Sequence, residues 1–360
     1  MRVGILTFHC ARNFGAVLQA YALQTYLEKQ GHQVYVIDYR PSYLVFPYRL
    51  FKFGEWRDKG FFTGLKWNVR EILVAPIRGL RNYRFEKFVT RRLHLHQIDF
   101  TKPCTDIDVF VFGSDQIWNP IICHGYDKNY LADAEAFRGK KCIAYSASAG
   151  RVVNVESAKG QLLDRLSFFD KIGVREISLL KWLKSNGIDN AVMTLDPVLL
   201  TGNDGFESII QEPKTRKPYL LLFLLEKLPI AEKIAKIVAE RENLEIIELT
   251  LAHESVRFRG KMQAASPESF LRMIKDASYI ITTSFHATAF SILFKKNFTA
   301  VSTYDSLNER VQSLLSLFDL ESRLCFNENN IDFSPIDYER DFTKFEAVKK
   351  DSENFLNSLE

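Results

Sequence analysis

Short apolar runs alternate with helical patterns along almost the whole chain of 360 residues, and this alternation limits the possible folds more than any other feature. Runs typical of strands occupy 2–8, 33–38, 107–112, 142–146, 171–174 and 191–195, then 218–224, 244–249, 278–281 and 297–301. Helical patterns occupy 16–30, 155–168, 176–186, 229–242, 266–275, 287–294 and 307–317. Short strands separated by helices form βαβ units around parallel sheets. The sequence therefore predicts an α/β fold with two doubly wound parallel sheets.

A segment rich in turn-forming residues separates the two series of strands. It runs from Asp196-Pro197 through Gly202-Asn-Asp-Gly205 to Pro213-Lys-Thr-Arg-Lys-Pro218. We therefore predict a first domain over 1–200 and a second domain over 217–335. A C-terminal segment, 341–360, is helical by its pattern and is expected to pack back across the first domain. Ligands of such folds bind beyond the carboxyl ends of the strands, so the cleft between the two sheets is the expected site.

The composition excludes few classes of protein. A hydrophobic fraction of 46% and a charged fraction of 26% are ordinary for a soluble globular chain. The first eight residues are typical of a strand, and no apolar run reaches about 18 residues, so we expect neither a secretion signal nor a membrane span. The five cysteines are scattered and contain no C-x-x-C pair. They fit reduced thiols in a cytoplasmic protein and argue against structural zinc.

Residues 41–95 differ from the rest of the chain in charge. They hold twelve Lys or Arg against four Asp or Glu, together with many aromatic residues such as Tyr43, Trp56 and Trp67. Basic and aromatic side chains together suit a membrane interface, an anionic lipid-linked substrate or nucleic acid. An amphipathic helical insertion with a solvated basic face explains the pattern equally well. We predict a helical basic and aromatic insertion here, with peripheral contact to the inner face of the membrane and no nucleic acid.

The segment Thr282-Thr-Ser-Phe-His286 joins an apolar strand to an apolar helix. Thr283 and Ser284 are natural N-caps, so His286 is expected in the first helical turn beside unpaired backbone N–H groups. A helix N-terminus attracts anions, and a histidine there can donate a hydrogen bond or a proton. An enzyme acting on a phosphorylated acid would place a working group at such a position. The alternative is a core histidine bonded to a neighbouring carbonyl.

Polar residues also follow the strand at 107–112, in the run Gly113-Ser-Asp-Gln-Ile-Trp-Asn119. Asp115, Gln116 and Asn119 can bind sugar hydroxyls, Asp115 can act as a base, and Trp118 can stack on a sugar face. The alternative is an Asx-type turn beside a packed tryptophan. Asp106-Ile-Asp108 imitates the D-x-D metal motif of some nucleotide-sugar transferases, but it lies at the opposite end of the same strand, so we expect no metal.

Two further junctions carry candidate anion contacts. The first strand leads into Phe8-His-Cys-Ala-Arg-Asn-Phe-Gly15, where Gly15 can expose backbone N–H groups and His9 lies near the cleft. This loop is neither G-x-G-x-x-G nor a Walker A loop, which disfavours NAD and ATP. The strand at 171–174 ends in Arg175-Glu176, where a guanidinium can clamp a carboxylate or phosphate and Glu176 can complement the helix dipole.

Several of these segments, in this order, resemble the polysaccharide pyruvyl transferase family. The matching pieces span about residues 1–315, outside the 41–95 insertion; they are Gly4-Ile-Leu-Thr-Phe-His9, Asn13-Phe-Gly-Ala-Val-Leu-Gln19, Gly113-Ser-Asp-Gln-Ile-Trp118, Tyr145-Ser-Ala-Ser148, Val174-Arg-Glu176, Leu195-Asp-Pro-Val198, Ser284-Phe-His286 and Asn308-Glu-Arg310. The resemblance implies two Rossmann-like domains in a glycosyltransferase-B-like arrangement. It also implies transfer of pyruvate from phosphoenolpyruvate (PEP), a co-substrate, to two sugar hydroxyls as a cyclic ketal, without a cofactor.

Site residues follow from the resemblance and from the junctions above. We predict catalytic roles for His286, Arg175 and Asp115, and PEP contacts from Arg175, Ser284, Phe285, His286 and Arg310. Predicted acceptor contacts are His9, Asn13, Gly15, Ser114, Gln116, Trp118 and Asn119. Some members of the family carry Arg and Lys where this chain has Ser284 and Ser306. The charge that binds PEP must then come from elsewhere, with Arg310, Lys295 and Arg12 as candidates.

Two other functions remain open on the sequence alone. A nucleotide-sugar glycosyltransferase of the same fold would use His286 and the helix N-terminus to hold a diphosphate. A non-catalytic protein that binds a glycan or a lipid carrier would use 41–95 as its attachment surface. For the pyruvyl transferase, a lipid-linked oligosaccharide in the synthesis of an exopolysaccharide or capsule is the expected acceptor.

Overall fold

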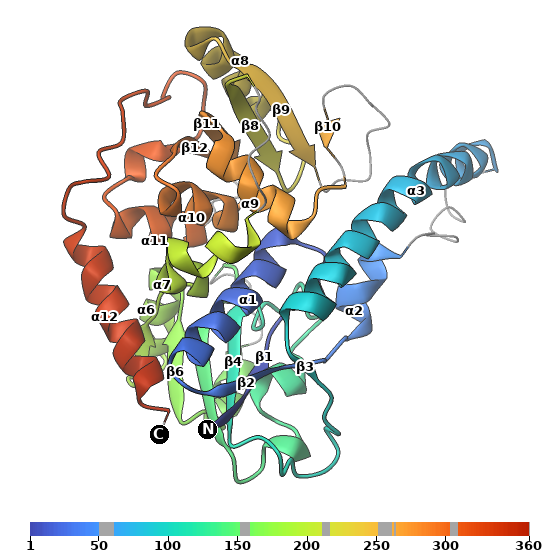
Figure 1. Ribbon diagram of the computed structural model, residues 1–360. Helices are drawn as coiled ribbons and strands as arrows, with labels where there is room; N and C mark the ends of the chain where they lie inside the picture. The colour runs from blue at the N-terminus through green and yellow to red at the C-terminus, as the bar shows by residue number, and fades with distance from the viewer. Residues whose placement is uncertain are drawn as a thin grey trace.

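The computed structural model describes residues 1–49, 61–151, 159–210, 217–250, 261–262, 264–302 and 309–359, with the backbone alone for 61–71 and 261–262. Two parallel sheets, with helices between their strands, make up the body of the molecule (Figure 1). The predicted α/β fold with two doubly wound sheets is therefore confirmed. Every strand pair in both sheets is parallel, as βαβ units require.

The first sheet has the strand order β3-β2-β1-β4-β5-β6-β7, which is the Rossmann order extended by a seventh strand. Its strands are β1 (Arg2–Leu6), β2 (Gln33–Ile37), β3 (Leu95–His96), β4 (Val109–Asp115), β5 (Lys141–Ala147), β6 (Lys171–Val174) and β7 (Ala191–Met193). The helices of this half are α1 (Phe14–Lys29), α2 (Ser42–Val45), α3 (Phe61–Arg92), α5 (Lys159–Leu166) and α6 (Ile177–Ser185). Short 3-10 turns lie at η1 (Phe46–Tyr48), η2 (Lys128–Leu131) and η3 (Glu135–Phe137).

The second sheet has the order β10-β9-β8-β11-β12-β13, again the Rossmann pattern. Its strands are β8 (Tyr219–Leu224), β9 (Glu245–Thr250), β10 (Lys261–Met262), β11 (Tyr279–Thr282), β12 (Asn297–Val301) and β13 (Leu324–Cys325). Its helices are α8 (Pro229–Glu242), α9 (Pro267–Asp276), α10 (Phe285–Leu293) and α11 (Glu309–Leu317), with a 3-10 turn at η6 (Glu321–Arg323). Between the sheets lie α7 (Pro197–Thr201), η4 (Asn203–Gly205) and η5 (Glu207–Ile209).

The C-terminal helix α12 (Thr343–Asn357) lies against the first sheet rather than the second (Figure 1). Ser352 Oγ accepts a hydrogen bond from the backbone N–H of Leu195 at 2.8 Å. Lys141 Nζ donates to the carbonyls of Ser358 and Leu359, and the Phe355 ring lies 6.0 Å from that of Tyr145. The end of the chain thus covers β5 and the segment that leads into α7.

One hydrophobic core runs through both halves of the molecule. Phe14 of α1 stacks on Phe270 of α9 with ring centroids 4.4 Å apart, and Phe85 of α3 and Phe223 of β8 pack against this pair. All four rings are buried. Helix α1 therefore lies between the two sheets and belongs to the packing of both.

Candidate active site

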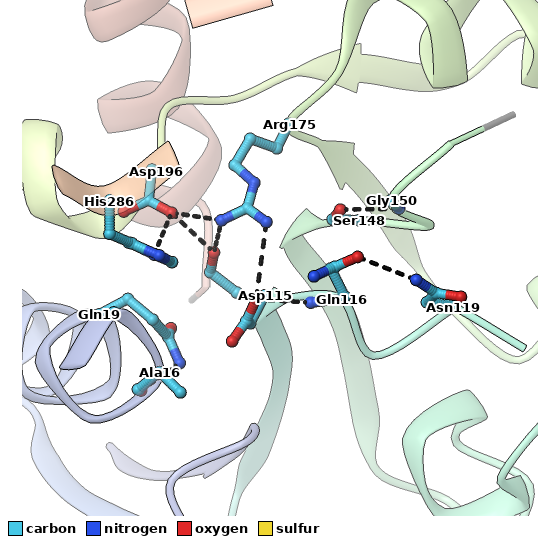
Figure 2. A network of polar contacts seen from close by, with 12 residues as sticks. Ala16, Gln19, Asp115, Gln116, Asn119, Ser148, Gly150, Arg175, Asp196 and His286 are labelled. Carbon is cyan, nitrogen blue, oxygen red and sulfur yellow. Dashed lines mark hydrogen bonds and ion pairs between the residues drawn. The ribbon is translucent and has the colours of Figure 1, made fainter. Parts of the chain in front are cut away.

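Arg175 and His286, which are 111 positions apart in the sequence, converge on one carboxylate oxygen (Figure 2). Asp196 Oδ2 accepts a hydrogen bond from Arg175 Nη1 at 2.6 Å and lies 3.4 Å from His286 Nε2. The second distance permits an ion pair when the ring is protonated, but it lacks hydrogen-bond geometry. All three side chains are buried. The inter-domain contact expected from the sequence is therefore present, with Asp196 at its centre.

The sequence placed His286 correctly at the start of a helix. Ser284 is the N-cap of α10, and its Oγ accepts from the backbone N–H of Ala287 at 3.3 Å. Helix α10 begins at Phe285, two residues before the predicted start, so His286 is the second residue of its first turn. The first turn of a helix leaves backbone N–H groups without partners inside the helix and favours anions.

Two guanidinium groups lie close to the Phe285 ring. The Cζ atom of Arg175 is 4.4 Å from the centre of its ring, and that of Arg310, from α11, is 5.9 Å away. The Nε and Nη2 atoms of Arg175 are buried and have no hydrogen-bond partner in the described part of the chain. Nε lies 3.8 Å from Glu176 Oε1 and Nη2 lies 3.7 Å from Asp115 Oδ1, which are ion pairs longer than hydrogen bonds. Both donors can therefore still form hydrogen bonds to an incoming oxyanion.

Gly15 packs directly against the His286 ring. A Cβ atom built on Gly15 would lie 2.0 Å from His286 Nδ1 and 2.4 Å from its Cγ, far inside van der Waals contact. Asn13, the N-cap of α1, accepts from the backbone N–H of Gly15 at 3.0 Å. The imidazole thus lies between α1 of the first half and Asp196, and only glycine leaves room for it.

Asp115 and Ser114 complete this polar group at the carboxyl end of β4. Asp115 Oδ1 lies 3.7 Å from Arg175 Nη2, and Ser114 Oγ lies 3.3 Å from Asp196 Oδ2. Asp115 has a φ of 76° and Ser146, at the end of the neighbouring strand β5, a φ of 50°. Left-handed backbone is unfavourable for such residues by about 1–3 kcal/mol and is found often at functional sites.

Burial and the neighbouring charges decide the ionisation of this group. Burial alone would raise the pKa of Asp196, but His286 and Arg175 outweigh it and hold that pKa below its ordinary value. Burial raises the pKa of Glu176, whose Oε1 accepts from Ser148 Oγ, although Arg175 opposes the rise. Burial lowers the pKa of Arg310, and the nearby Arg175 lowers it further. An incoming anion would relieve the repulsion between these two guanidinium groups.

The loops after β4 and β5 lie side by side next to Asp115 (Figure 2) and are joined by backbone hydrogen bonds from Ser148 N–H to the Asp115 carbonyl at 3.0 Å and from Trp118 N–H to the Ser148 carbonyl at 3.1 Å. Asn119 Nδ2 donates to Gln116 Oε1 at 2.9 Å, and a Cβ on Gly150 would lie 2.4 Å from the same oxygen. Gln116 is half-buried and Asn119 is buried. These side chains lie in the same region as Asp115. Their contact with an acceptor stays a prediction.

Two predicted acceptor residues prove to be core residues. Trp118 has no exposed surface and packs against Phe169 with ring centroids 5.8 Å apart, so its ring is inaccessible to a sugar, contrary to the expected stacking. His9 is also fully buried, and its Nε2 lies 3.0 Å from Asp38 Oδ1. A histidine held in this way is unsuited to bind or deprotonate a sugar. Each residue follows a strand as expected, but its side chain turns into the core.

The alternative cations for PEP lie in different places. Lys295 is exposed and pairs with Glu339 at 2.6 Å, and Arg12 donates to the carbonyl of Tyr48 at 2.9 Å. Arg310 is therefore the candidate that the structure brings to Arg175, while Ser306 lies outside the described residues. Among the described residues, no group of three or more His, Cys, Asp or Glu is arranged to hold a metal ion.

The insertion is helical where the structure describes it. Helix α3 projects beyond the body of the molecule (Figure 1), while 50–60, including Trp56, lie outside the described residues. Ile72, Leu73 and Tyr83 are more than half exposed. None of the described helices is long and apolar enough to cross a membrane.

Asp196 is the site residue that sequence reasoning missed. The motif Leu195-Asp-Pro-Val198 was part of the resemblance, but Asp followed by Pro is also an ordinary helix start. Asp196 is indeed the N-cap of α7 and accepts from the backbone N–H of Val198 at 3.0 Å. One carboxylate oxygen caps the helix and the other faces Arg175 and His286.

Comparison with known proteins agrees with the resemblance. The family description "Polysaccharide pyruvyl transferase" matches residues 13–306, a range that includes Arg175, Asp196 and His286 and excludes His9 and Arg310. No curated protein matches the chain.

The solved structures that resemble the chain include two UDP-GlcNAc 2-epimerases. The enzyme from Neisseria meningitidis has 10% identity and a TM-score of 0.49, covering 100% of this chain and 94% of its own. The enzyme from Methanocaldococcus jannaschii has 12% identity and a TM-score of 0.45, covering 97% and 93%. An O-GlcNAc transferase from Thermobaculum terrenum has 10% identity and a TM-score of 0.41, covering 100% and 64%. These identities are too low to indicate a reaction.

Proposed function

The chain belongs to the polysaccharide pyruvyl transferase family, and from this premise we propose that it transfers pyruvate from PEP to two hydroxyls of one sugar in a cell-surface or capsular polysaccharide precursor, forming a cyclic ketal. The observation that supports this most is the convergence of Arg175, Arg310 and His286 around Phe285 and Asp196. PEP carries a phosphate and a carboxylate on one small carbon skeleton, so its site needs several cationic groups close together.

The reaction conserves the two hydroxyl protons. Protonation of the PEP methylene carbon makes C2 electrophilic, and one sugar hydroxyl adds there while a base accepts its proton. The C2–O bond to phosphate then breaks, phosphate leaves, and the second hydroxyl closes the ketal at C2. One proton equivalent ends on the new methyl group and the other on the released phosphate. The protein must therefore supply an acid within reach of both the methylene carbon and the phosphate, and a base near the acceptor.

His286 and Asp115 fit these two roles. His286, at the N-terminus of α10, is the general acid toward the phosphate. Arg175, whose Nε and Nη2 form no hydrogen bond within the described residues, clamps the donor together with Arg310. Asp115, 3.7 Å from Arg175, is the base for the sugar hydroxyl. General acid–base groups contribute about 10²–10⁴-fold to a rate. Asp196, which contacts both groups, positions the His286 imidazole relative to the Arg175 guanidinium.

The acceptor is proposed to be a lipid-linked oligosaccharide at the inner face of the membrane. The excess of eight positive charges over 41–95 and the exposed Ile72, Leu73 and Tyr83 on α3 support contact with an anionic membrane surface. Sedimentation with vesicles of an anionic phospholipid tests this, with vesicles of a neutral phospholipid as the control. Equal recovery of the protein in the supernatant of both would refute the contact.

A ligand panel separates this function from its alternatives. PEP at about 100 times its Kd should stabilise the protein by about 2.7 kcal/mol, whereas UDP and GDP should not stabilise it. Stabilisation of the protein by UDP or GDP, measured as a rise in its melting temperature, and none by PEP would instead favour a nucleotide-sugar glycosyltransferase. Release of phosphate from PEP in the presence of lipid-linked oligosaccharides tests the reaction itself. His286→Ala should lose at least about 10²-fold in this assay with little loss of folding, and near-normal turnover would rule out the acid role.

A further inference from the structure

Glu176 carries a buried carboxyl group to which the reaction above gives no role. It is the N-cap residue of α6, but its side chain makes no capping hydrogen bond to this helix, which the structure describes in full. The first N–H of α6, on Ile177, donates instead to Ser313 Oγ of α11 at 3.2 Å. The carboxyl group therefore does not cap the helix, although it is only 1% exposed.

One carboxyl oxygen of Glu176 is held by the protein and the other is available. Oε1 accepts a hydrogen bond from Ser148 Oγ, which in turn accepts from the backbone N–H of Gly150 at 3.1 Å (Figure 2). Arg175 Nε lies 3.8 Å from the same Oε1. Oε2 is buried and has no hydrogen-bond partner among the residues that the structure describes. A protonated carboxyl group fits this arrangement, because its carbonyl oxygen accepts while its O–H is left to donate.

The surroundings of Glu176 favour this protonated form. Burial raises the pKa of Glu176, and Glu309 of α11 adds to the rise. Arg175, Ser148 and Arg310 oppose the rise without cancelling it. A buried carboxylate oxygen without a partner is also costly, which acts in the same direction. Glu176 therefore keeps its proton to a higher pH than a glutamate in water.

The proposed reaction delivers a proton twice, first to the PEP methylene carbon and later to the leaving phosphate. A single acid that served both steps would have to regain a proton between them. Arg175 Nη1 contacts Asp196, whose carboxylate adjoins His286. Arg175 Nε, by contrast, faces Glu176. Two candidate acids therefore lie near different nitrogen atoms of the proposed clamp.

We propose that Glu176 is the acid that protonates the PEP methylene carbon, while His286 serves the phosphate. The inference rests on the proposed function, because it takes PEP as the donor held by Arg175. The O–H bond at Oε2 breaks, and the electron pair of the PEP double bond forms the new C–H bond. Arg175 and Ser148 then stabilise the carboxylate left on Glu176. The two hydroxyl protons, one of them taken up by Asp115, restore both acids through solvent, so one proton ends on the methyl group and one on phosphate.

Phosphate release from PEP, with lipid-linked oligosaccharides as acceptors, tests this role. Glu176→Gln keeps the size of the side chain and removes its acid, so kcat should fall about 10²–10⁴-fold while the KM for PEP stays unchanged. Glu176→Asp, which keeps an acid, should restore part of the rate. Glu240→Gln, at an exposed position of α8, should behave like the wild type. A melting curve for each variant checks that it folds.

The pH dependence of kcat separates an acid from a mere counter-ion of Arg175. In the wild type both Glu176 and His286 must hold a proton, so kcat should fall at high pH as two protons are lost. In Glu176→Gln it should fall as one proton is lost. A changed KM with kcat retained would identify a counter-ion, and a lower kcat with the wild-type pH dependence would identify a structural role.

Either of these results overturns the inference, and loss of turnover in His286→Ala would then show that the proposed function still stands. If the wild type releases no phosphate from PEP with any of these acceptors, the proposed function fails and the inference fails with it.

Discussion

At the scale of single residues, the position of the His286 ring depends on the absence of a side chain at Gly15. Because a Cβ there would lie 2.0 Å from His286 Nδ1, Gly15→Ala must push the imidazole aside. The backbone of α1 can keep its course, since alanine favours a helix by about 1 kcal/mol over glycine. We expect kcat to fall on the order of 10²-fold, the usual effect of misplacing a catalytic group by about 1 Å. Phosphate release from PEP measures it.

Gly160→Ala is the matched control for that experiment. Gly160 also lies in a helix, but a Cβ built on it meets nothing within 4 Å. The turnover of Gly160→Ala should therefore equal that of the wild type. If Gly15→Ala retains full turnover, the position of the imidazole seen here is not the one used in the reaction.

Asp196 predicts a pH dependence of stability. Its pKa is lowered in the folded protein, so its contribution is fully present above the ordinary pKa near 4 and is lost as the pH falls below it. At pH 7, Asp196→Asn should lower the free energy of unfolding on the order of 3 kcal/mol, because Arg175 loses its nearest ionic partner. The difference in unfolding free energy between wild type and variant should then narrow as the pH falls from about 4 towards 2. Urea unfolding at each pH measures it, and a constant gap would contradict the assignment.

The sequence revealed which residues follow strands but not which way their side chains turn. Arg175, His286 and Asp115 lie together because the carboxyl ends of parallel strands share one edge, a rule that sequence patterns can apply. Trp118 and His9 obey the same rule and yet point into the core, since their partners Phe169 and Asp38 come from distant segments. Asp196 was missed for the converse reason, because its helix-capping role concealed its contact with two distant cations.

At the scale of elements, α12 stabilises the segment that carries Asp196. Ser352 Oγ accepts from Leu195 N–H, and Leu356 is 1% exposed. Leu356→Ala should therefore cost about 2–5 kcal/mol of unfolding free energy. Lys350→Ala, on the exposed side of the same helix, should cost under about 0.5 kcal/mol. Chemical unfolding followed by circular dichroism compares them, and equal stabilities would mean that α12 is dispensable.

All ten strands expected from the sequence are present, while three further strands were not foreseen. These are β3, β10 and β13, each of two residues at the edge of a sheet. Two residues give no periodicity, so only the neighbouring strand defines them. Helix α3 likewise continues through Pro76, which a local rule would treat as a break. The helix at 307–317 begins at Glu309 in the described part of the chain.

At the scale of the whole molecule, the two sheets share a core instead of meeting across an open hinge. The sequence predicts two domains with a cleft between them, and domains joined by small polar interfaces usually move relative to each other. Here Phe14, Phe270 and Phe223 pack across the boundary, and Phe290 lies 5.1 Å from Phe206 of the connecting segment. The pattern of apolar residues predicts that a core forms, but it does not indicate that one core is shared by both sheets.

This shared core implies that the two halves unfold together, and the tryptophans allow a test. All four, at positions 56, 67, 118 and 182, lie in the first 200 residues, so their fluorescence reports on the first half alone. Phe270→Ala in α9 of the second half should cost about 3–5 kcal/mol, because it empties the position stacked on Phe14. The urea midpoint from tryptophan fluorescence should fall together with that from circular dichroism. Ile237→Ala, at an exposed position of α8, should change neither midpoint. An unchanged fluorescence midpoint in Phe270→Ala, with two transitions by circular dichroism, would mean that the halves are independent and that the site between them can open.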